Sequence, residues 1–110
     1  MTMFLPTGKS LLRAIVNASS SGNNEIVAAT AGKKIVVYGW ELLTRAAVVV
    51  KWRSANTDLT GAMSFGVGGS WSKDIHAQGE PYLDTVAGEA LNLNLSAAEA
   101  VNGTVWYLLK

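Results

Sequence analysis

The chain has 110 residues, of which 49% are hydrophobic and 15% are charged, and its formal net charge is +1. A nucleic-acid partner is therefore not expected, because binding to a phosphate backbone requires an excess of clustered Lys and Arg. Cysteine is absent and histidine occurs once, which excludes disulfides, thiol catalysis and the usual zinc ligand sets. We expect no metal and no cofactor. No apolar run reaches the length of a membrane span, so no membrane partner is expected either.

The N-terminal segment differs from the rest of the chain. Residues 1–12 are largely apolar and precede the first confident strand, and a proline within them cannot donate to a β-ladder. An apolar terminal arm has to be held in place, either by its own sandwich or by a neighbouring subunit. We predict an arm with the first strand and loop over residues 1–24 and a β-sandwich over residues 25–110, within a single domain. The predicted protein-interface residues are the apolar residues of the arm and one tryptophan: Phe4, Leu5, Pro6, Leu11, Leu12 and Trp71.

Alternation with a period of two dominates the chain. It predicts about eight strands, over residues 11–17, 25–30, 34–43, 48–53, 59–66, 82–86, 91–95 and 101–109. In the third of these, strict alternation places Ile35, Val37 and Gly39 on one face and Val36, Tyr38, Trp40 and Leu42 on the other. Trp40 and Trp52 lie in strong strand patterns and are predicted to be core residues. Short strands separated by Gly, Asn, Ser and Asp favour an antiparallel sandwich or barrel.

Three connecting segments carry local signals. Residues 70–80 are polar and predict a loop. Residues 96–99, Ser-Ala-Ala-Glu, have the spacing of a capping box and predict one helical turn. Asn102 and Gly103 both tolerate a positive φ, so they predict a type I′ turn.

Catalytic and nucleotide-binding signals are weak. Residues 8–10, Gly-Lys-Ser, resemble the end of a phosphate-binding loop but lack its first glycine and the preceding strand. Residues 66–69 do not form a dinucleotide-binding glycine pattern. His76 lies in a polar segment without a defined nucleophile and carboxylate beside it, so we expect an exposed loop histidine. The sequence therefore predicts no enzyme.

Two tryptophans are candidates for a binding surface. Trp71 lies between two serines after a glycine-rich stretch, and Trp106 lies in the last predicted strand on the face opposite Val105 and Tyr107. An exposed tryptophan on a small sandwich suits stacking on a sugar ring or anchoring a protein interface. Burial of all four tryptophans is the competing interpretation.

Three stretches resemble a known family: residues 27–37 (VAATAGKKIVV), 50–63 (VKWRSANTDLTGAM) and 88–98 (GEALNLNLSAA). They are similar to a small β-sandwich module of tailed bacteriophages. This module occurs as a stand-alone capsid decoration protein, also called a cement or staple protein, and within fibre chains. The resemblance extends over residues 25–107 and contains no catalytic signature. It implies a jelly-roll fold and a place on the outer surface of the phage head.

The function that this resemblance implies is structural. A decoration protein binds the assembled capsid, bridges subunits of the major capsid protein and stabilises the shell against the pressure of packaged DNA. The expected location is the virion, and a homodimer or homotrimer would gain avidity on the capsid lattice. The alternative is a fibre tip or carbohydrate-binding module that recognises a host surface through exposed aromatic residues.

Overall fold

The computed structural model describes residue 8 and residues 10–110 of the chain. The described residues form ten strands and no helix: β1 (Leu12–Ala18), β2 (Gly22–Val27), β3 (Ile35–Thr44), β4 (Val48–Ser54), β5 (Thr57–Asp58), β6 (Met63–Phe65), β7 (Ser70–Lys73), β8 (Leu83–Asp84), β9 (Leu91–Leu95) and β10 (Val101–Leu109). No helix in this part of the chain could therefore cross a membrane. The predicted interface residues Phe4, Leu5 and Pro6 lie outside the described residues.

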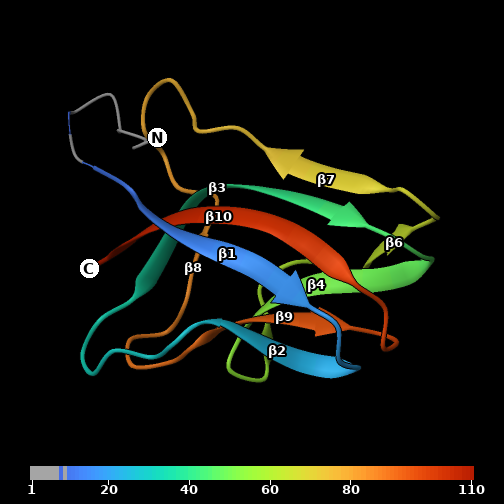
Figure 1. Ribbon diagram of the computed structural model, residues 1–110. Coiled ribbons are helices and arrows are strands. Elements are labelled where there is room, and N and C mark those ends of the chain that lie inside the picture. Colours follow the sequence, from blue (N-terminus) through green and yellow to red (C-terminus); the bar gives the residue numbers. More distant parts are fainter. Residues whose placement is uncertain (1–7, 9) are drawn as a thin grey trace.

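The strands form two antiparallel sheets stacked as a sandwich (Figure 1). Within the described residues, the first sheet has the order β1-β10-β3-β7, and β8 also pairs with β3. The second sheet has the order β2-β9-β4-β5, and β6 also pairs with β4. The prediction of an all-β antiparallel sandwich is therefore confirmed.

The main core lies between the two sheets and is built from the inward-facing side chains of the long strands. The buried pattern of β9 and β4 is strictly alternating, as their sequences predict. The prediction that Trp40 and Trp52 are core residues is confirmed, since they are 3% and 0% exposed. Their rings meet edge to face with centroids 5.7 Å apart, a favourable geometry for two aromatic quadrupoles.

Strand β3 departs from the predicted alternation because it contains a β-bulge. Trp106 of β10 pairs with Gly39, but Tyr107 pairs with Val37, so Tyr38 is the extra residue. The extra residue shifts the alternation of inward-facing and outward-facing side chains by one position. Val37 and Trp40 consequently face the same core, and the prediction that they lie on opposite faces is wrong.

The bulge also directs a second set of apolar side chains to the outer face of the first sheet. There Leu11, Val36 and Tyr38 are buried in a separate cluster, against which Ile75, Trp106 and Leu108 pack. The chain after β7 runs over this cluster. A Cβ atom on Gly39 would lie only 2.8 Å from the carbonyl oxygen of Lys73, so the absence of a side chain at Gly39 permits this close approach.

Three local predictions were wrong. Residues 70–73 form strand β7, paired with β3, although their polar composition predicted a loop. Ser96 starts no helical turn; its backbone N–H donates to the carbonyl of Val49 and its Oγ accepts from the N–H of Val49. Asn102 and Gly103 are not a turn but part of β10, paired on both sides. Tertiary pairing overrides the local signal in each case.

Candidate functional site

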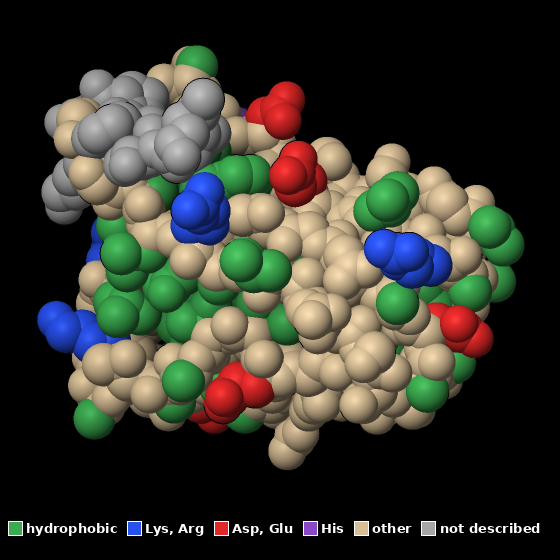
Figure 2. Space-filling model, viewed as in Figure 1, with side chains coloured by type: hydrophobic (Ala, Val, Ile, Leu, Met, Phe, Trp, Pro, Cys, Tyr) green, Lys and Arg blue, Asp and Glu red, His purple; other side chains and the backbone are tan. Residues whose placement is uncertain are grey.

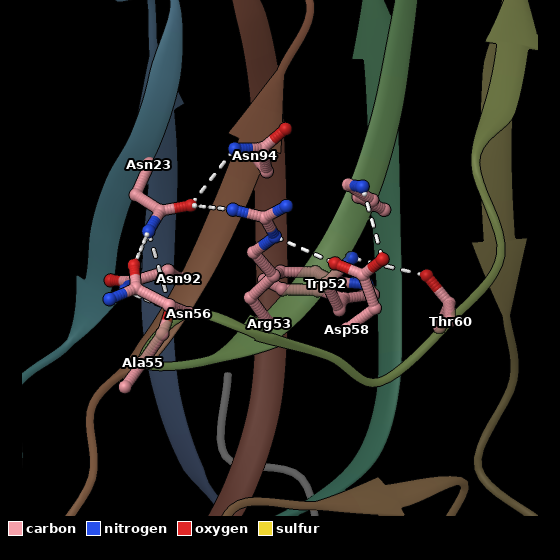
Figure 3. A network of polar contacts seen from close by, with 10 residues as sticks. Asn23, Trp52, Arg53, Ala55, Asn56, Asp58, Thr60, Asn92 and Asn94 are labelled. Carbon is pink, nitrogen blue, oxygen red and sulfur yellow. Dashed lines mark hydrogen bonds and ion pairs between the residues drawn. The ribbon is translucent and has the colours of Figure 1, made fainter.

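The outer face of the second sheet carries a network of polar side chains (Figure 3). Asn23 of β2 donates from Nδ2 to Oδ1 of Asn56 at 2.8 Å, and its own Oδ1 accepts from Nδ2 of Asn94 at 2.9 Å. Asn92 donates to the carbonyl oxygen of Ala55 at 3.0 Å. These amides therefore bind one another and the nearby backbone, which fixes neighbouring strands of the sheet.

Charged side chains continue this network at β4 and β5. The carboxylate of Asp58 accepts from Nε of Arg53 at 2.7 Å and from Nζ of Lys51 at 3.1 Å. The hydrogen bond from Arg53, followed by that from Lys51, lowers the pKa of Asp58 below its ordinary value of 3.8. The polar face is thus largely satisfied by contacts within the chain, which leaves little for a partner to gain there.

The outer face of the first sheet is different. The register places Ile15 of β1, Thr104 of β10 and Glu41 of β3 in one row across the sheet. In the adjoining row, Asn102 of β10 lies next to Leu43 of β3. Ile15 is 77% exposed and Leu43 is 52% exposed. Two large aliphatic side chains therefore face outward on either side of β10.

A depression of about 370 Å³ lies on this face, and it is lined by Glu41, Leu42, Leu43, Ser70, Ser72, Asn102 and Gly103. Gly103 contributes no side chain, and a Cβ atom there would overlap the carbonyl oxygen of Glu41. The close approach of these two strands therefore requires glycine. The rim combines exposed Leu43 with polar side chains, and such a surface is better suited to contact with a partner protein than to contact with solvent.

The predicted interface residues that the structure describes do not form one patch. Leu11 is 6% exposed and packs on its own sandwich beside Val36 and Tyr38. Leu12 begins β1 and is 45% exposed. Trp71 is half-buried on the inner side of β7, where it meets Trp40 edge to face at 5.2 Å. Whether these residues contact a partner stays a prediction.

The sequence analysis did not single out Ile15 or Leu43. A signal for Leu43 was present, because Leu42 and Leu43 are adjacent in a strand and must face opposite sides of the sheet. Ile15 carries no such signal, since its exposure depends on what covers the outer face of β1. Trp106, the second candidate for an aromatic platform, is half-buried against the outer cluster.

The side chains that could act in catalysis or bind a metal ion do not gather at one place in the described part of the chain. His76 stacks on Tyr82 with ring centroids 4.3 Å apart, and the Tyr82 hydroxyl donates to the carbonyl oxygen of Asp74. This arrangement fixes the loop between β7 and β8 against the sandwich. Among residue 8 and residues 10–110, no group of three or more His, Cys, Asp or Glu side chains could hold a metal ion.

Comparison with known proteins gave no match to a family model, a curated protein or a solved structure. The class that the fold defines is an all-β antiparallel sandwich.

Proposed function

We propose that the chain is a decoration protein that binds the outside of an assembled tailed-phage head, bridges major capsid protein subunits and stabilises the shell. The resemblance of residues 25–107 to phage β-sandwich modules supports this proposal. A ligand that binds the assembled shell and not the free subunits stabilises the assembly by mass action. Such a protein needs a stiff scaffold and an adhesive surface.

The proposed fold within the sandwich class is a jelly roll. Successive strands from β1 to β4 alternate between the two sheets. Strand β10 lies between β1 and β3 in the first sheet, and β9 lies between β2 and β4 in the second. This order, in which the two C-terminal strands run back between earlier strands, supports the two interlocked Greek keys of a jelly roll.

The observation that carries the functional proposal is the contrast between the two outer faces. The second sheet presents amides and charges that are paired with each other, as Figure 3 shows. The first sheet presents exposed Leu43 at the rim of the depression. Burying exposed aliphatic side chains against a partner contributes roughly 25 cal/mol per Å² of apolar area. We therefore place the capsid-binding surface on the first sheet.

The N-terminal arm has a secondary part in this proposal. Phe4, Leu5, Pro6, Leu11 and Leu12 are proposed to extend the capsid contact from the start of β1. The burial of Leu11 in the outer cluster supports this, because it anchors the end of the arm on the outer face of the first sheet. Trp71 supports the surface from beneath, because it packs under β7 against Trp40.

The test compares the binding of two lysine variants to phage heads that lack this protein. Leu43→Lys places a charge beside the depression, whereas Val67→Lys places it at an 84% exposed position in the turn before β7. In co-sedimentation with the heads, we expect Leu43→Lys to weaken binding at least tenfold, because a buried unpaired charge is costly. Val67→Lys should bind as the wild type does. Equal binding by both variants would contradict the placement of the surface.

A further inference from the structure

Strand β1 is an edge of the first sheet within the described residues. It pairs with β10 over all seven of its residues without a register shift. No other strand described in the structure pairs with it. An edge strand presents a row of backbone N–H and C=O groups that can pair with another strand.

The other edge strands carry features that discourage such pairing, and β1 does not. Strand β2 contains a bulge between Glu25 and Val27. Strands β5, β6, β7 and β8 have only two to four residues each. Strand β1 has seven residues, no proline and a single charged side chain, Arg13. Short edges, bulges, charge and proline are the devices that natural sheets use to protect their edges.

The surface around β1 is also apolar. Ile15 is 77% exposed on its outer side and Leu12 is 45% exposed on its inner side. Leu12 lies next to half-buried Tyr107 in the register. In the view of Figures 1 and 2, hydrophobic side chains gather along the first half of β1 and toward the end of β10. The edge therefore combines open backbone groups with apolar side chains.

We propose that β1 pairs antiparallel with β1 of a second copy of this chain, about a two-fold axis that passes beside Ile15. In that register Leu12 faces Ala18 of the second copy, Arg13 faces Asn17 and Ala14 faces Val16. Each Arg13 thus lies opposite an amide and not opposite the other Arg13, so the only charges of the two strands do not repel. Ile15 lies opposite itself, and its exposed side chain becomes covered.

The sequence of β1 is self-complementary in this register. We therefore infer that the strand that pairs with the open side of β1 is β1 of a second copy. All seven residues of each strand find a partner, and the symmetry is the commonest among homo-oligomers. The first sheet of one copy would join the first sheet of the other into one continuous sheet. The outer faces of the two copies would then lie on the same side of that sheet. The inference does not depend on the proposed function, since self-association is measured without capsids.

Cross-linking through a single introduced cysteine tests the register directly. The chain contains no cysteine, so Ile15→Cys provides the only thiol. Residues directly opposite in an antiparallel pair have Cα atoms about 4.5–5.5 Å apart, within the range that a disulfide spans. We expect Ile15→Cys to form a covalent dimer under mild oxidation much faster than Leu43→Cys, its matched control on the same face. Equal rates for the two variants would overturn the proposed register.

Sedimentation equilibrium of the full chain provides a second measurement. Ile15→Lys would place two lysines opposite each other at the axis and should raise the dimer dissociation constant about tenfold or more. Leu43→Lys should dimerise as the wild type does, even where it no longer binds phage heads. A wild-type chain that stays monomeric at high micromolar concentration would overturn the proposal. A dimer that Ile15→Lys leaves unchanged would overturn it as well, because the interface would then lie elsewhere.

Discussion

Gly103 shows how one residue sets the close approach of two neighbouring strands in the first sheet. It is the third residue of β10, between β1 and β3, where the chain passes close to Glu41. Its hydrogen occupies a space that a methyl group could not enter without displacing backbone atoms.

We expect Gly103→Ala to destabilise the protein by about 1–3 kcal/mol, because the added Cβ atom overpacks a site bounded by rigid backbone. Gly61→Ala is the matched control, since a Cβ atom there meets nothing within 4 Å. Urea unfolding monitored by tryptophan fluorescence measures both. Equal midpoints for the two variants would show that β10 moves away from Glu41 at little cost.

At the scale of elements, the β4–β5 hairpin depends on a charged group at its tip. Arg53 of β4 pairs in register with Asp58 of β5, and the connecting Ala55 has a positive φ of 49°. Side-chain contacts between Arg53, Lys51 and Asp58 hold this strained connection in place. These contacts of the hairpin therefore depend on the ionised form of the Asp58 carboxyl group.

The lowered pKa of Asp58 gives a pH dependence with a definite sign. A carboxyl group whose pKa is lower in the folded state stabilises it above the unfolded pKa and loses that contribution as the pH falls through the folded pKa. We expect Asp58→Asn to be less stable than the wild type at pH 7, with the difference disappearing as the pH falls below 3.8.

Denaturant unfolding at a series of pH values measures this difference. Asp84→Asn serves as the control, because its exposed carboxylate lies 3.8 Å from Nζ of Lys34 and should contribute little. A constant difference between Asp58→Asn and the wild type across the whole pH range would contradict the electrostatic explanation.

The fold class follows from the sequence where alternation is unbroken. The leucines of residues 91–95 and the alternating residues of β4 face the core as expected, because every inward side chain except that of Ser54 is apolar and every outward one is polar or half-exposed. Alternation failed in β3, where Tyr38 forms a bulge whose position depends on pairing with β10. A bulge is a property of two strands, so one strand's sequence does not reveal it.

The candidate surface was less predictable than the fold. Exposure of Leu43 and Ile15 depends on how β7 and β10 are arranged around them, and the polar sequence of β7 did not indicate a strand. Trp71 illustrates the reverse case. Its polar neighbours indicated exposure, but alternation in β7 turns its ring inward against Trp40. Local composition therefore predicts which residues are polar, while pairing decides which of them face outward.

At the scale of the whole molecule, a stiff sandwich separates three surfaces with different properties. One outer face is polar and paired within itself, and the other is partly apolar and carries a depression beside Leu43. Among the strands that the structure describes, β1 forms a long edge that pairs on one side only. An adhesive face together with a self-complementary edge would let a two-fold dimer hold two capsid subunits at once. Such bivalent binding gains avidity without new contacts.

The copy number of the chain in purified phage particles tests the proposed function most directly. Gel densitometry against the major capsid protein gives this ratio. If the protein decorates the head, it should be present at a simple ratio to the capsid protein, on the order of hundreds of copies per particle. A few copies confined to a vertex would contradict lattice-wide decoration and favour the fibre or carbohydrate-binding alternative. Complete absence from the particle would contradict both.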